Sequence, residues 1–328
     1  MTTTRTTPPL PTGRDPTPSH DDHPLGAVRP ALLGRRRGWP GGGGHNGAMG
    51  VLLEVDAVGG FVAGFEEVPV ALQSLRRRQL DLCGRLAVED WRRPSRCHLW
   101  TVHDVIRHVR DACRLHVQSL HGSPTPFSPG NPFNSRETPL RWLDRTAGQT
   151  PTQTVAELAG LCAEEEASLE VRVEHGGDDL VDGPYGPIHW TTLTAHVFWD
   201  AWLHHRDVTE ALGLIHRSSA VEDRVVALYG LLLASVPAAV TGRPLDVTVG
   251  LTAGRRGRYS TSVRPGRVVL GAADSSDEPA LRGQLRPVVD ALAGRRPGLE
   301  VVLHGEQSDR EPLTWLANIL LPEAGPVR

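Results

Sequence analysis

An acid and a histidine with metal-ligand spacing occur in the stretch HVFWDAWLHHRDVTEALG, residues 196–213. Asp200 and His204 are four residues apart, so on a helix of 3.6 residues per turn both side chains leave the same face. A carboxylate and an imidazole at this spacing can bind one divalent cation, as the two histidines of an HExxH motif do. The spacing also fits an ordinary amphipathic helix whose polar atoms are satisfied internally, because acid–histidine pairs are common on helices.

His196 lies one turn before Asp200 on the same face. It cannot share a cation with His204, because eight residues of helix separate the two by about 12 Å. Asp200 must therefore pair with one of these two histidines, and a third ligand must come from another element.

A second helix with an inward histidine is predicted in LWTVHDVIRHVRDACRLHVQSLHG, residues 99–122. Thr101 is the expected N-cap, and Asp104 three residues later completes a capping box. One face of this helix carries three apolar residues and one imidazole: Val105, His108, Val109 and Ala112. His108 therefore points inward, where it needs a partner. Taken alone, such a histidine is more often a hydrogen-bonded core residue than a metal ligand.

Other helices are needed to position these residues. Apolar residues recur at helical spacing over residues 65–91, 154–173 and 221–240, which predicts three further long helices. Proline and glycine predict loops over residues 123–139 and 176–189.

After Pro244 the spacing of apolar residues changes from helical to alternating. Apolar and polar residues alternate over residues 245–251. Residues 259–263 and 268–270 flank Arg-Pro-Gly-Arg, which predicts a hairpin. We expect a helix over residues 281–292, a strand over 299–303 and a closing helix over 312–321. The predicted fold class is mostly α plus small α+β.

Composition limits the class of protein. The chain has 328 residues, 39% hydrophobic and 22% charged, which is typical of a soluble globular protein with two domains. The net charge of −3 does not favour nucleic acid or an anionic membrane as a partner, and no apolar run is long enough to span a membrane. The four cysteines form no CxxC pair, which favours free thiols and a cytoplasmic location. The oligomeric state cannot be predicted.

Residues 1–48 are rich in Thr, Pro, Gly and Arg and have no apolar period, so we expect a disordered tail. All 35 basic residues are arginine, a codon-usage signature of a GC-rich genome.

Three stretches together resemble one family. WTVHDVIRHV and DAWLHHRDVTEALG are similar to two signatures of the mycothiol-dependent maleylpyruvate isomerase family, within the DinB-like superfamily. LRGQLRPVVDALAGRRP resembles the sterol-carrier-protein-like C-terminal domain found in many members. The resemblance implies a metal-binding DinB-like four-helix bundle over residues 60–242, followed by a small sheet-and-helix domain over residues 243–328.

The resemblance also implies a ligand set of His108, Asp200 and His204. Many members have glutamate where Asp200 stands. Because aspartate is one methylene shorter, the metal geometry is expected to differ from that of those members. Zinc is the expected metal, because histidine and carboxylate ligands with an open position suit it.

The implied chemistry is activation of a low-molecular-weight thiol, mycothiol, as a nucleophile. A thiol bound to the cation loses its proton, and the thiolate attacks a small electrophilic substrate. Addition to a C=C bond, rotation and elimination would make the protein a cis–trans isomerase, whereas stable attachment would make it an S-transferase. Two alternatives are a non-catalytic ligand- or partner-binding protein of the same fold and a metal-dependent hydrolase that uses bound water.

Three further residues are candidates for supporting roles. Asp207 could orient the His204 imidazole, or it could form a helix-surface ion pair with Arg206 or Arg217. His196 and His205 are candidate proton shuttles. His205 is expected to be peripheral, because it lies about 100° around the helix from His204.

Overall fold

The structure is a computed structural model that describes residues 54–57, 67–97, 99–123, 125, 137–175, 180–184, 186–253, 255–264, 267–273, 278–295 and 298–313. All of them belong to one compact unit, Gly43–Arg328. The predicted disordered tail, residues 1–48, lies outside the described residues, and so does the predicted closing helix beyond residue 313. Within the described segments, no helix is both long and apolar enough to cross a membrane.

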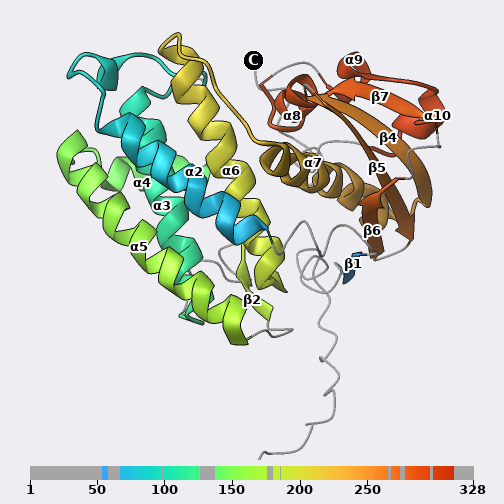
Figure 1. Cartoon of the computed structure of the whole chain (residues 1–328), viewed down its shortest axis with the longest axis horizontal. Coiled ribbons are helices and arrows are strands. Elements are labelled where there is room, and N and C mark those ends of the chain that lie inside the picture. The colour runs from blue at the N-terminus through green and yellow to red at the C-terminus, as the bar shows by residue number, and fades with distance from the viewer. Residues whose placement is uncertain are drawn as a thin grey trace, which may run out of the picture. The chain divides into compact units, whose positions relative to one another are not determined.

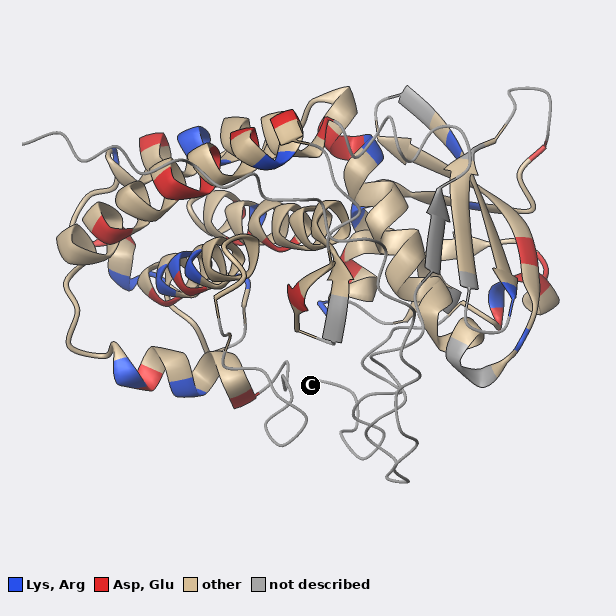
Figure 2. Ribbon diagram, turned by 90° about the horizontal axis from the view of Figure 1, so that it is seen from below, with Lys and Arg blue, Asp and Glu red and all other residues tan. Residues whose placement is uncertain are grey.

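Four long helices pack side by side as a bundle (Figure 1). They are α2 (Val68–Cys83), α3 (Val102–Leu120), α5 (Pro151–His175) and α6 (Trp190–Ala211). Both α2 and α3 contact α5 and α6, which closes the bundle. Charged residues of both signs are interspersed along the helices (Figure 2). The mostly α fold class and the four-helix bundle predicted from the sequence are confirmed.

The start of α3 follows the local signal in its sequence. The Asp104 amide donates to Thr101 Oγ1 at 3.2 Å, and the Thr101 amide donates to Asp104 Oδ2 at 2.9 Å, so the capping box is present. Val105 and Val109 are fully buried and His108 is 8% exposed, as their shared face predicts. This helix therefore brings His108 into the bundle interior.

The most deeply buried helix is α6, because α2, α3 and α7 (Ala220–Thr241) all pack against it. Trp202 is fully buried, and residues 201–209 are buried without interruption. A helix enclosed on several sides has no solvent-facing stripe, so its polar side chains must find partners inside the protein.

Smaller elements pack against the helices of the bundle. The short helix α4 (Glu137–Arg145) packs against α3, and strands β2 (Leu180–Gly183) and β3 (Gly186–His189) form an antiparallel hairpin against α6. The sequence predicts a loop where this hairpin lies. That prediction is wrong because Val181 and Ile188, which face each other in the ladder, are apolar and pack on the bundle core.

A six-stranded sheet follows the helices, with strand order β1-β6-β5-β4-β7-β8. Its strands are β1 (Glu54–Ala57), β4 (Leu245–Ala253), β5 (Arg255–Arg264), β6 (Arg267–Ala272), β7 (Leu281–Gln284) and β8 (Leu303–His304). The predicted hairpin is confirmed as β5–β6, with Val263 opposite Val268. Strand β1 comes from a segment before the bundle and pairs in parallel with β6. The small sheet-and-helix part of the predicted fold class is present.

Two boundaries in this region differ from the prediction. Helix α8 spans Leu285–Leu292, because the four preceding residues pair with β4 as β7. The expected strand over residues 299–303 is mostly a short helix, α9 (Leu299–Val302), and only β8 joins the ladder. In the first case a strand partner that is distant in the sequence overrides the local helix preference. Two more short elements are η2 (Asp90–Arg92) and α10 (Gln307–Arg310).

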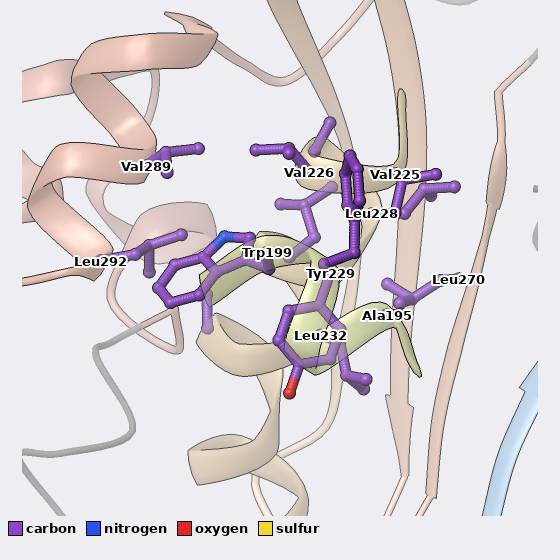
Figure 3. Packing of buried hydrophobic residues seen from close by; sticks show 14 of the residues in the cluster. Ala195, Trp199, Val225, Val226, Leu228, Tyr229, Leu232, Leu270, Val289 and Leu292 are labelled. Carbon is purple, nitrogen blue, oxygen red and sulfur yellow. The ribbon is translucent and has the colours of Figure 1, made fainter. Parts of the chain in front are cut away.

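Helix α7 links the bundle to the sheet. It begins at a Ser219–Glu222 capping box and ends at Gly242, whose φ of 71° suits glycine. It packs against α6 and also against β5, β6 and α8. Figure 3 shows Trp199 of α6, Tyr229 of α7 and Leu292 of α8 in the resulting core. The sequence predicts α7 only as a bundle helix, whereas its apolar surface also covers the sheet.

Candidate metal centre

Three side chains from two helices meet inside the bundle. Asp200 Oδ1 lies 3.6 Å from His108 Nε2 and 3.4 Å from His204 Nε2. The three donor atoms all lie within 4.8 Å of one another. Two ligands of a tetrahedral zinc site, each bonded at roughly 2.0–2.2 Å, lie about 3.3–3.6 Å apart. The spacing and the nitrogen and oxygen donors of these three residues fit a single divalent cation.

The charges of this group depend strongly on one another. Burial raises the pKa of Asp200, but the His204 and His108 imidazoles lower it more, so it stays well below its usual value. Burial lowers the pKa of His204, and Asp200 raises it more, to well above the usual value. Without a cation, His204 is therefore an imidazolium held by carboxylates. A cation at Nε2 would take the place of that proton.

A second carboxylate lies behind His204. Asp207 Oδ2 is 3.1 Å from His204 Nδ1, and Asp207 is fully buried. Arg295, which follows α8, binds both oxygens of Asp207 at 2.9 and 2.5 Å. The predicted alternative of a surface pair with Arg206 or Arg217 is wrong, because Asp207 is buried. A carboxylate on the second nitrogen of a ligand histidine fixes its ring and tautomer.

Two residues near His204 were not predicted from the sequence. The Cys97 thiol lies 3.1 Å from Asp207 Oδ2 and 3.6 Å from His204 Nδ1. The Trp100 ring packs over both imidazoles, with centroids 5.1 Å from His108 and 6.0 Å from His204. Trp100 is part of the WTVHDVIRHV motif, and this motif could have indicated that Trp100 belongs to the site. No signal marked Cys97, because its partners are more than 100 residues away.

Cys97, His204 and Asp207 also have metal-ligand spacing. The Arg295 guanidinium pairs with Asp207 and lies 3.4 Å from the Cys97 sulfur. A fixed positive charge beside two of the three donors opposes a second cation there. The first group, on the other side of the His204 ring, is therefore the candidate metal centre.

A pocket that is partly open to solvent lies beside the candidate metal centre. Its walls come from α3, α4, α6 and the β2–β3 hairpin, and they include His108, His116, Ser119, Trp142, His196 and Asp200. Two of the three candidate ligands thus face open space. All of its lining residues lie between residues 108 and 200, before the C-terminal sheet.

His196 and His205 lie in different places. His196 lines the pocket, and its Nδ1 is 2.8 Å from the Tyr229 hydroxyl. Burial lowers the pKa of His196, so it is neutral at pH 7. His205 instead faces His216, with the two Nδ1 atoms 3.1 Å apart, and it does not line the pocket. The structure brings five of the six predicted residues to one region and leaves His205 outside it.

Comparisons with known proteins agree with the two helix motifs. Residues 72–209 match the family model described as the mycothiol maleylpyruvate isomerase N-terminal domain, a range that includes His108, Asp200 and His204. A crystal structure of the mycothiol-dependent maleylpyruvate isomerase is 17% identical in sequence, with a TM-score of 0.46, and covers 72% of this chain and 90% of that chain. A mutant of that enzyme gives 16% identity and a TM-score of 0.45, with the same coverage. No curated protein matches the chain. Residues 72–209 are therefore similar to the mycothiol maleylpyruvate isomerase N-terminal domain.

Proposed function

We propose that the protein is a metal-dependent enzyme that activates a low-molecular-weight thiol, mycothiol, toward a small electrophilic substrate. The reaction class is cis–trans isomerisation or S-transfer. The observation that carries the proposal is the spacing of three donor atoms, from His108, Asp200 and His204, at the wall of a pocket. The family match supports mycothiol as the thiol.

In this proposal His108, Asp200 and His204 hold a divalent cation, and zinc suits two imidazoles and one carboxylate. A divalent cation held there would lower the pKa of a thiol bound at its open position. Asp207 keeps the Nδ1 proton on His204, so that Nε2 has its lone pair free for the cation. Arg295 in turn holds Asp207 in place.

The pocket supplies groups that can move a proton near the substrate. His196 is neutral, lines the pocket and is oriented by Tyr229, so its ring can accept a proton and return it. His116 also lines the pocket, but Glu165 at 2.8 Å and Thr194 at 3.1 Å occupy both of its ring nitrogens, so it shapes the wall and His196 is the candidate proton carrier. Apolar residues such as Leu193 and Val197 complete the walls and limit water around the reacting atoms.

One observation favours a second candidate, a non-catalytic binding protein. His204 lies between Asp200 and Asp207, so this group can satisfy its own charges with a proton in place of a cation. A protein that had lost its metal could therefore keep the same arrangement.

Metal analysis and a thiol-dependent assay separate the two candidates. Purified protein is expected to contain about one zinc per chain and to convert maleylpyruvate, or a comparable small electrophile, only when mycothiol is added. Product analysis by mass distinguishes isomerisation from S-transfer. Metal-free protein that still binds a ligand would support the non-catalytic candidate, and turnover without thiol would support a hydrolase.

We also propose the domain division at residues 242/243 and a cytoplasmic location. Gly242 ends α7 with a left-handed C-cap, and five of the six strands of the large sheet follow it, which supports the division. Strand β1 and helix α7 cross this boundary in space. The four free cysteines support a reducing compartment.

A further inference from the structure

Helices α3 and α5 lie side by side and run in the same direction. Four of the side-chain contacts between them have sequence separations of 51, 47, 49 and 47 residues: His103–Thr154, Arg110–Glu157, His116–Glu165 and His121–Ser168. Two more, Arg114–Glu157 and His121–Glu164, have separations of 43 residues. Facing residues on these helices are therefore 43 to 51 positions apart. Cys113 and Cys162 are separated by 162 − 113 = 49 residues, so they face each other within this series.

The two thiols differ in access and acidity. Cys113 is fully buried, whereas Cys162 is partly exposed, and both are free. A hydrogen bond between them lowers the pKa of Cys162 and raises that of Cys113, and the Arg76 guanidinium also lowers the pKa of Cys162. A partly exposed, more acidic thiol beside a buried one is the arrangement of an attacking and a resolving cysteine.

The thiol pair lies one turn from a pocket residue. His116 is three residues after Cys113, and Glu165 is three residues after Cys162. The His116 and Glu165 side chains are in contact at 2.8 Å, and Arg76 binds Glu165 at 2.9 Å. His116 lines the pocket. A change in the spacing of the two helices at the cysteines would therefore reach the pocket through the next contact.

We propose that Cys113 and Cys162 are a modification site at which hydrogen peroxide forms a reversible disulfide between α3 and α5. The Cys162 thiolate attacks one oxygen of the peroxide, the O–O bond breaks, and a sulfenic acid and hydroxide result. The hydroxide takes the proton released by Cys162 and leaves as water. The Cys113 sulfur then attacks the Cys162 sulfur, the S–O bond breaks, and the hydroxyl leaves with the Cys113 proton as a second water.

The disulfide draws the two helices together at this level. Its S–S bond is about 2.05 Å long, much shorter than a contact between two thiols. The His116–Glu165 contact in the next turn must adjust, which moves His116 in the pocket. Oxidation is therefore expected to weaken ligand binding, and this modification goes beyond the proposed function.

The test uses the unmodified full-length protein. After treatment with hydrogen peroxide, free thiols are alkylated and the protein is digested without reduction for mass spectrometry. We expect a linked Cys113–Cys162 peptide pair with the loss of two hydrogen atoms, together with alkylated Cys83 and Cys97. Dithiothreitol should restore four alkylated cysteines. Oxidation of Cys97 with Cys113 and Cys162 unlinked would overturn the proposal, and so would Cys162 sulfinic acid without a link.

Two single variants sharpen the test. In Cys113→Ser, peroxide should carry Cys162 to sulfenic and sulfinic acid, because no thiol resolves it. In the matched control Cys83→Ser, the disulfide should form as in the original protein, because burial raises the pKa of Cys83 to about 12 and keeps it unreactive. Disulfide formation in Cys113→Ser between Cys162 and any other cysteine would show that the two helices do not set the pairing.

Discussion

Two pairs of histidines, each with one member on α6, have similar ring geometry and opposite electrostatics. His108 and His204 have ring centroids 4.7 Å apart at an interplanar angle of 78°, and His205 and His216 have centroids 5.2 Å apart at 61°. Asp200 contacts both rings of the first pair. The charged residues that act on the second pair are arginines: Arg78, Arg206 and Arg286.

This difference in neighbours decides what each pair can do. Asp200 raises the pKa of His204 despite its burial, so the first pair attracts a proton or a cation. Burial and nearby arginines lower the pKa of His205 to about 4 and that of His216 to about 2, so the second pair is neutral. Two facing imidazoles are therefore not a candidate metal site by themselves, and the carboxylate that contacts both rings makes the first pair a candidate.

Removal of Asp200 should have the largest effect, because it makes the first pair resemble the second. In Asp200→Ala, two imidazoles remain, and we expect metal affinity to fall by more than about 100-fold, beyond the effect of changing a residue that only supports a ligand. Thiol-dependent activity should fall with it. Elemental analysis and competition with a chromophoric chelator measure the metal, and circular dichroism should show a folded bundle. Full metal content in this variant would contradict the proposed ligand set.

Asp207→Asn tests the carboxylate behind His204. We expect metal affinity to fall by about 10- to 100-fold, because the imidazole loses the partner that holds its ring and tautomer. Asp290→Asn is the matched control: it changes a buried carboxylate that binds Arg206 at 3.0 and 3.2 Å and Arg96 at 3.1 Å. An equal loss in both variants would mean that packing between α6 and α8, and not the Asp207–His204 contact, sets the affinity.

The second pair predicts a pH dependence of stability. In the folded protein, the pKa values of His205 and His216 lie below the usual value of 6.5. Between the folded pKa and 6.5, the unfolded chain therefore binds more protons than the folded protein. The contribution of the two neutral histidines to the free energy of unfolding is complete above about pH 6.5 and is lost as the pH falls toward 4. His216→Phe removes one titrating ring and keeps the contact with Trp202. The loss between pH 6.5 and 4 should be smaller by on the order of 2 kcal/mol, measured by urea denaturation. An unchanged pH dependence would show that the pair is not neutral in the folded protein.

Asp200→Glu should have the smallest effect on metal binding. It introduces the residue found in many members of the family that the sequence resembles, keeps the charge and lengthens the side chain by one methylene. We expect metal to be retained within about threefold, whereas activity is more sensitive because the cation moves relative to the pocket. The metal content and kcat/KM of the same preparation provide the measurement. Loss of metal here would mean that the bundle is built around the shorter aspartate.

Several features of this protein follow from local sequence alone. The 3.6-residue period places Asp200 and His204 on one face, and the same period turns His205 away from them. The Thr101–Asp104 capping box predicts where α3 begins, and the apolar positions beside His108 predict that it points inward. The β5–β6 hairpin also follows from its pattern, because alternation and a Pro-Gly turn act over neighbouring residues. These predictions succeed because helix geometry and turns depend on residues within a few positions.

Other features depended on packing between distant segments. Only the structure shows that His108 Nε2 lies 3.6 Å from Asp200, that Arg295 binds Asp207, and that Cys97 lies beside His204. The pocket faces α4 and the β2–β3 hairpin, and β7 and β8 exist because a neighbouring strand pairs with them. Helix period gives the direction of a side chain, but the register between two helices, or between a helix and a sheet, sets which side chains meet. That register comes from the close packing of whole elements, so the candidate ligands could be predicted from the sequence, whereas the groups that surround them were decided by the tertiary structure.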